Sequence, residues 1–187
     1  MKINDMYNRM KSGFDDTSDN TNNTREIVSG YFCCSFDDSI NAIKESTKFY
    51  NSVANDVLNE RKINEVNFHN YLKHQLLCRL HEIKAYSEVN IMDTRRLVAV
   101  SHECISSIQI LIRDEIHVNV YMRSSDFDGA LPVDLLFLSS LPAELIDHLD
   151  KFKGNTGYNE VNDNVILEIA KKKVHLNINF GSLHRTT

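Results

Sequence analysis

Two consecutive runs of alternating apolar residues constrain the fold of this chain more than any other feature. In a strand, successive side chains point to opposite faces, so apolar residues at every second position predict one buried face. The first run covers residues 105–112 and the second covers residues 116–122. The turn between them is Arg113-Asp114-Glu115. The two runs therefore predict a hairpin with one apolar face.

Helices and further strands are predicted around this hairpin. The best-defined helix covers about 66–86, where apolar residues recur every three or four positions: Phe68, Leu72, Leu76, Leu80 and Ile83. Two more helices are predicted over residues 35–59 and 133–150, and Pro142 is expected to kink or split the second of them. Strands are predicted over residues 27–34, 97–100 and 174–180, whereas residues 165–172 fit either a strand or a helix. This pattern predicts an α+β fold with helices packed on a mixed, largely antiparallel sheet.

Length and local composition predict a single domain after an N-terminal tail. The chain has 187 residues, which is enough for one domain with a sizeable core. Residues 13–25 are polar and rich in Asp, Asn and Thr, which is typical of a segment without a core of its own. We therefore expect residues 1–25 to be a flexible tail and residues 26–187 to be the domain.

Charge and hydropathy exclude several classes of partner. The net charge is −5, which argues against non-specific nucleic-acid binding as the main activity. No apolar run is long enough to span a membrane, and the N-terminus lacks the apolar centre of a secretory signal, so a cytoplasmic protein is expected. The four cysteines form no C-x-x-C pair and no zinc-ligand spacing, so no metal site is expected.

Residues 95–134 contain the side chains most able to do chemistry. Arg95 and Arg96 begin this stretch, and Arg123 and Ser124 follow the hairpin. Arginines grouped with a hydroxyl suit a phosphate, because guanidinium groups give bidentate, charge-assisted hydrogen bonds to its oxygens. The same positive charges would lower the pKa of a nearby thiol such as Cys104 and so favour a nucleophilic thiolate.

Asp134 could select a base, because an ionised carboxylate accepts a hydrogen bond from an exocyclic amino group such as that of cytosine. A phosphate clamp, a nucleophile and a base-reading acid together suggest a site for a nucleoside monophosphate. Each residue also has a plainer interpretation. Cys104 could be a buried core thiol, Arg95-Arg96 a solvated pair, and Asp134 the cap of the following helix.

The order of these residues resembles the thymidylate synthase superfamily, which includes deoxycytidylate and cytidylate hydroxymethylases. The segment Arg123-Ser124-x-Asp126, followed by Leu131-Pro132 and Asp134, is similar to the family's R-S-x-D-x-x-x-G-x-P-F-N segment. Cys104 with Gln109 resembles the nucleophilic cysteine and the glutamine of its strand, and the segment ending in His184 resembles the one that contacts the sugar. The resemblance covers about residues 93–187 and implies a thymidylate synthase-like fold.

The resemblance also implies a reaction and a role for each residue. Cys104 would add to C6 of a pyrimidine, and C5 would then attack the one-carbon unit of 5,10-methylenetetrahydrofolate. The phosphate would be held by the arginines and the serine, with Arg95 and Arg96 reaching the neighbouring subunit of a homodimer. Asp126 would lie near the folate, Gln109 beside the site, and His184 at the sugar hydroxyl. Glu45 and Glu60 are candidates for the family's early glutamate.

Asparagine stands at position 134 in the synthases that act on uracil, so Asp134 favours a cytosine nucleotide. We therefore expect a hydroxymethyltransferase acting on dCMP or CMP. The alternative is a relative with reduced activity that binds a nucleotide or a partner subunit without turnover. This alternative is favoured by the expectation that the C-terminal segment that closes over folate is missing after His184. A structural interaction module with a coincidental cysteine is the third reading.

Overall fold

The computed structural model describes residues 3–15, 24–36, 64–85, 91–151 and 163–186. Its strands are β1 (Thr24–Val28), β2 (Tyr31–Phe36), β3 (Val98–Val100), β4 (Ile105–Ile112), β5 (Ile116–Asp126) and β6 (Val174–Thr186). Its helices are α1 (Ile3–Asp15), α3 (Asn64–Ala85), α4 (Ala130–Lys151) and α5 (Asp163–Ala170). The helix predicted over 35–59 and the candidate glutamates Glu45 and Glu60 lie outside the described residues.

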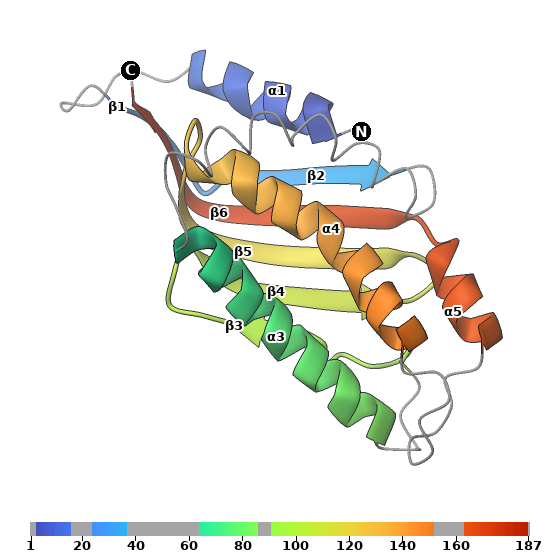
Figure 1. Cartoon of the computed structure of the whole chain (residues 1–187). Coiled ribbons are helices and arrows are strands. Elements are labelled where there is room, and N and C mark those ends of the chain that lie inside the picture. The colour runs from blue at the N-terminus through green and yellow to red at the C-terminus, as the bar shows by residue number, and fades with distance from the viewer. Residues whose placement is uncertain (1–2, 16–23, 37–63, 86–90, 152–162, 187) are drawn as a thin grey trace.

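The six strands form one mixed sheet, and α3 and α4 lie across one of its faces (Figure 1). The strand order is β1-β6-β5-β4-β3, and β2 also pairs with β6. Strands β5 and β6 are parallel, whereas the other pairs are antiparallel. The predicted α+β class and the predicted hairpin are therefore confirmed, with β4 and β5 as the two arms of the hairpin.

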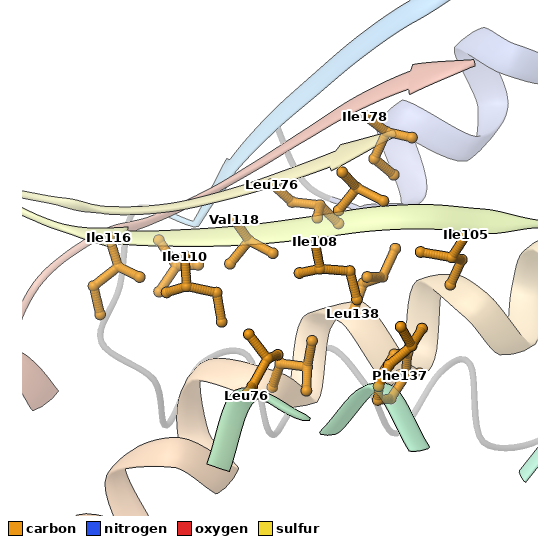
Figure 2. Packing of buried hydrophobic residues seen from close by; sticks show 14 of the residues in the cluster. Leu76, Ile105, Ile108, Ile110, Ile116, Val118, Phe137, Leu138, Leu176 and Ile178 are labelled. Carbon is orange, nitrogen blue, oxygen red and sulfur yellow. The ribbon is translucent and has the colours of Figure 1, made fainter. Parts of the chain in front are cut away.

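The apolar core lies between the sheet and the helices. Ile108 and Ile110 on β4 and Val118 on β5 point from the sheet toward Leu138 of α4 and Leu76 of α3 (Figure 2). All five side chains are at most 1% exposed. The predicted alternation in the hairpin and the predicted apolar stripe on the helix of residues 66–86 are therefore the two surfaces that meet in the core.

The N-terminal segment differs from the predicted flexible tail. Residues 3–15 form α1, and Met10 and Phe14 on this helix are fully buried in the core. The ring of Phe14 meets that of Phe127 edge to face, with 5.1 Å between the centroids. The prediction of a flexible tail was wrong for residues 3–15, because two apolar side chains one turn apart are enough to anchor a short polar helix to the core. Strand β1 also begins before the predicted domain boundary, at Thr24.

Pro142 does not split the helix in which it lies. Helix α4 continues from Ala130 to Lys151 through Pro142, although proline removes one helical hydrogen bond. Leu138, Leu141 and Leu145 are buried on both sides of the proline, so core packing stabilises both halves. The undecided segment of residues 165–172 is helical as far as Ala170, the last residue of α5 (Asp163–Ala170).

A line of backbone irregularities crosses three neighbouring strands of the sheet, β4, β5 and β6, and the turn beside them. Ser106 is an extra residue in β4 opposite β5, and the pairing of β5 with β6 skips Arg123 and Gly181. Beyond β6, the line continues into the turn between β1 and β2, where Ser29 has a φ of 56°. There the Ser29 amide donates to the Gly181 carbonyl oxygen at 3.0 Å. Aligned irregularities of this kind bend a sheet and increase its local twist.

The bend also reverses which side chains of β5 and β6 face the core. Before it Met122 and Phe180 are buried, and after it Ser125 and Leu183 are buried, at an interval of three residues instead of two. Both strands therefore continue past the predicted ends of their alternating runs. The bend brings the segment Ser124–Asp126 and His184 to one end of the sheet, next to the residue that precedes β4, Cys104.

Strand β3 lies at one edge of the sheet and is held by a side chain of α3. The Gln75 amide group donates to the Val100 carbonyl oxygen at 2.9 Å. Its own carbonyl oxygen accepts from the Val100 backbone N–H at 3.2 Å. Gln75 therefore takes the place that a neighbouring strand would have beside this residue.

No helix among the described residues is long and apolar enough to cross a membrane.

Candidate active site at the bend of the sheet

A cavity of about 660 Å³ opens where α3 and α4 meet the start of β4. Its walls come from the N-terminal part of α3, the start of α4 and the connection between β3 and β4. The lining residues are Phe68, Tyr71, Val100, Ser101, His102, Glu103, Cys104, Ala130 and Asp134. Two residues singled out from the sequence, Cys104 and Asp134, thus share one cavity although 30 positions separate them. Ligand-binding pockets typically have volumes of about 300–1,000 Å³.

Cys104 is placed beside Arg123 by the backbone of the hairpin. The Arg123 amide donates to the Cys104 carbonyl oxygen at 2.8 Å, directly before the β4–β5 pairing begins at Ile105 and Met122. The thiol is half-buried, so it is not the fully buried core residue of the plainer interpretation. The bend thus puts Arg123 of β5 beside Cys104, the residue that directly precedes β4.

Asp134 is the fifth residue of α4, so it does not cap that helix. Its side chain is 5% exposed, and its Oδ1 lies 2.8 Å from Nε2 of His69 on α3. The imidazole of His69 is stacked on the ring of Phe137, with centroids 4.3 Å apart and an angle of 5° between the planes. His69 was not among the predicted site residues. No spacing to another histidine, cysteine or acid could have singled it out, because its partner lies 65 positions away on another helix.

The surroundings of Cys104 raise the pKa of its thiol above the ordinary value. Burial is the main cause, and the negative charges of Asp134 and Glu103 act in the same direction, whereas the Arg123 guanidinium lowers the pKa. The sequence had suggested a net lowering by three arginines. Only Arg123 has this effect, so the thiol is neutral at neutral pH in the free protein.

Arg95 and Arg96 lie away from this cavity. Both side chains are exposed, and Arg96 lines a separate groove of about 340 Å³ between α3 and β3. The backbone of this segment is held by Arg113, whose guanidinium donates to the carbonyl oxygens of Met92, Asp93 and Thr94. The two arginines therefore belong to a fixed surface segment and do not line the cavity of their own chain.

Gln109 does not line the cavity either. It is a half-buried residue of β4 on the face of the sheet opposite the core, where its amide donates to the Arg95 carbonyl oxygen at 3.4 Å. On this face, Asn177 donates to Asn119 at 2.9 Å, and the rings of His117 and His175 are stacked with centroids 5.0 Å apart. None of the described helices covers this face, which we call the open face.

The remaining predicted site residues gather beyond the bend. Asp126 and His184 occupy paired positions of β5 and β6, and Ser124 is paired with Ser182 in the same ladder. The Phe127 amide donates to the His184 carbonyl oxygen at 2.9 Å. Asp126, His184 and Ser124 are all half-buried, and none of them is among the cavity-lining residues. The structure thus divides the predicted site into a pair in the cavity, Cys104 and Asp134, and a polar group on the neighbouring strands.

Within the described ranges, no three or more His, Cys, Asp or Glu side chains are arranged to hold a metal ion.

Comparison with known proteins gives a structural match without a sequence match. No protein-family model matches the chain, and no curated protein matches it by sequence. Among solved structures, the chain is similar to the thermostable thymidylate synthase A of Bacillus subtilis, with a TM-score of 0.53 and 15% sequence identity. The match covers 99% of this chain and 80% of the synthase chain. At this identity the likeness concerns the fold, and the fold of this chain is thymidylate synthase-like.

Proposed function

We propose that this protein binds a pyrimidine nucleoside monophosphate in the Cys104 cavity and transfers a one-carbon unit to C5 of the base. The preferred substrate in this proposal is dCMP or CMP, and the product is the 5-hydroxymethyl nucleotide. C5 loses its proton when it gains the one-carbon unit, water supplies the hydroxyl, and the Cys104 thiolate leaves C6 at the end. The observation that carries the proposal is the meeting of Cys104 and Asp134 in one cavity, with Arg123 beside the thiol, in a thymidylate synthase-like fold.

Each of these side chains has a role that follows from its chemistry. The Cys104 thiolate adds to C6, and the electron pair of the C5–C6 double bond moves toward C5, which becomes nucleophilic. Asp134 accepts a hydrogen bond from the 4-amino group of cytosine, which uracil lacks. Arg123 and Ser124 hold the phosphate, and His184 holds the sugar.

The second substrate in this proposal is 5,10-methylenetetrahydrofolate, which supplies the one-carbon unit when it is bound. The cavity fits a large aromatic ligand in one respect: Phe68 and Tyr71 from α3 line it together with Cys104, and Tyr71 is 55% exposed. Aromatic side chains at a cavity wall favour stacking with a flat ring system. Asp126 is the residue we assign to the vicinity of this ligand.

The test of this proposal is release of tritium from C5-labelled dCMP or CMP in the presence of methylenetetrahydrofolate. The wild-type protein should release tritium, and Cys104→Ser should not, because a hydroxyl is a much weaker nucleophile than a thiolate at neutral pH. Asp134→Asn should shift the preference toward the uracil nucleotide, since an amide can also donate to a carbonyl oxygen. An unchanged base preference in Asp134→Asn would refute the role of that residue.

A second candidate function is nucleotide binding without turnover. The observation that favours it is the raised pKa of the Cys104 thiol, which leaves little thiolate at neutral pH. In that case wild type and Cys104→Ser would bind dCMP with equal affinity and neither would release tritium. Failure to bind any pyrimidine monophosphate, measured by calorimetry, would remove both candidates.

A homodimer is part of the proposed function. Arg95 and Arg96 are exposed and lie outside the cavity of their own chain, which suits a role at the phosphate of a neighbouring subunit. The open face of the sheet is the surface we assign to the contact between the two copies. Its hydrogen-bonded Asn119–Asn177 pair and stacked histidines give it polar groups that a second copy can complement.

A further inference from the structure

We propose that His69 is a positioning residue that holds Asp134 in its ionised form at the wall of the cavity, and through Asp134 sets the charge state of the Cys104 thiol. The inference deepens the proposed function, because the same contact would determine which base the cavity prefers. Its link to the thiol does not depend on any nucleotide.

The direction of the hydrogen bond between the two side chains follows from the proposed ionised form of Asp134. His69 Nε2 and Asp134 Oδ1 are 2.8 Å apart, and the two residues are only 7% and 4% exposed. An ionised carboxylate only accepts hydrogen bonds, so Nε2 carries the hydrogen and donates it. Loss of such a donor raises the pKa of a buried carboxylate, because burial disfavours the charged form and one hydrogen bond that offsets this cost is gone.

Packing keeps the donor in place. The His69 ring is almost parallel to the ring of Phe137, at 4.3 Å between centroids, and Phe137 lies one helical turn after Asp134 on α4. The same helix therefore supplies both the acceptor and the surface on which the donor rests. Rotation of the imidazole away from Asp134 would lose the stacking contact as well as the hydrogen bond.

The His69–Asp134 pair acts on the Cys104 thiol through the negative charge of Asp134. The groups that face Cys104 are Asp134 on α4, Glu103 in its own segment and Arg123 on β5. After burial, the negative charge of Asp134 is the largest influence that raises the pKa of the thiol. If His69 keeps Asp134 ionised, replacing His69 should lower the pKa of the thiol. His69 acts on the thiol through Asp134 and not by direct contact.

The experiment follows the rate of Cys104 alkylation by iodoacetamide against pH, site by site by mass spectrometry, in the full-length chain without nucleotide. Asp134→Asn removes the charge, His69→Phe removes the donor and keeps a flat ring, and His69→Gln keeps a donor. We expect the inflection of the rate profile to move to lower pH in Asp134→Asn and in His69→Phe. In His69→Gln it should stay at the wild-type position.

Two results would overturn the inference. A wild-type profile in His69→Phe would mean that the hydrogen bond from His69 is not what keeps Asp134 ionised. A wild-type profile in Asp134→Asn would mean that the carboxylate does not act on the thiol. Should His69→Phe fail to fold by circular dichroism, carbon-13 NMR of the Asp134 carboxyl in the wild type decides, because a carboxyl that is protonated at pH 7 contradicts the proposal.

The effect on base preference is measured separately, by calorimetric titration with CMP and UMP. The His69→Phe variant should bind CMP less well relative to UMP than the wild type does, because a protonated Asp134 offers a donor in place of an acceptor. An unchanged ratio would overturn this part of the inference. If the wild type bound neither nucleotide, the proposed function would fail, while the alkylation profiles would still decide whether His69 controls Asp134 and Cys104.

Discussion

Cys104 shows how opposite charges around a single residue compete in this fold. Arg123 favours the thiolate, whereas burial and two carboxylates favour the neutral thiol, and the second influence is larger. A thiol with a raised pKa is a weak nucleophile at neutral pH, and its reactivity rises only if a bound ligand changes the charge around it. Loss of Arg123, the neighbouring charge that lowers the pKa of the thiol, should therefore make Cys104 still less reactive.

Arg123→Gln should raise the pKa of the Cys104 thiol further and slow its alkylation at pH 8. The reason is that the guanidinium is the positive charge that lowers this pKa. The measurement is the alkylation rate against pH. Glu103→Gln is the matched control, since it removes a neighbouring charge of the opposite sign and should speed alkylation. Equal profiles for both variants would show that these charges do not control the thiol.

Single residues also mark the limit of prediction from this sequence. Cys104, Arg123 and Asp134 were found because their types and order carry chemical meaning. His69 was not found, because its importance arises from a contact between α3 and α4 that no local spacing encodes. The predicted direction of the shift in the pKa of the thiol was wrong for the same reason. The shift depends on burial and on which charged side chains fold close to the thiol, and Arg95 and Arg96 do not lie close to it.

Among the elements, β5 and β6 depend on the bend that they share. Gly181 has backbone and side-chain atoms so close that an added Cβ would lie 2.7 Å from the Arg123 carbonyl oxygen. Contacts this short with backbone cannot be relieved by rotating a side chain. The bend therefore requires glycine at this position for lack of space.

Gly181→Ala should destabilise the protein by about 1–3 kcal/mol, the usual range for overpacking in a well-packed interior. It should also change the environment of Cys104, since Arg123 is bonded to the backbone of that residue. Chemical denaturation gives the first quantity and the alkylation rate gives the second. Gly13→Ala is the control: its Cβ would meet only the flexible end of Ile27 at 3.1 Å, so little loss is expected. A Gly181→Ala protein as stable as the wild type would contradict the steric argument.

Regular elements were predictable where periodicity is strong, and irregular ones were not. The hairpin of β4 and β5, α3 and the first part of β6 follow from apolar residues at regular intervals. The bend was missed because the alternation of buried residues shifts by one at Arg123 in β5 and at Gly181 in β6, so residues 123–126 and 181–186 no longer match the pattern of the strands they extend. Helix α1 was missed because its polar residues outnumber the two side chains that anchor it, Met10 and Phe14.

For the whole molecule, the two faces of the sheet differ in what covers them. One face is buried under helices, whereas the open face presents a row formed by Leu111, His117 and His175 and a row formed by Gln109, Asn119 and Asn177. An antiparallel or mixed sheet with one uncovered face is stable in water when that face is polar, as it is here. The half-buried Leu111 is the apolar exception in the first row.

Leu111→Lys should dissociate the proposed homodimer, because each copy would place a new positive charge in the contact. Light scattering after size-exclusion chromatography should then give the mass of one chain, 21.5 kDa, where the wild type gives twice that value. The matched control is Leu167→Lys, which puts the same charge on an exposed leucine of α5 and should leave the mass unchanged. A monomeric wild type would refute the assignment of the open face.

The contact between Gln75 and Val100 has a consequence for how copies of this protein behave at high concentration. An uncovered sheet edge is a template on which strands of other molecules can add, and repeated addition leads to fibrous aggregates. The glutamine amide already satisfies both backbone groups of Val100, the last residue of the short edge strand. A strand from another molecule would have to displace the Gln75 side chain before it could pair with β3. The contact therefore protects this edge of the sheet from strand addition.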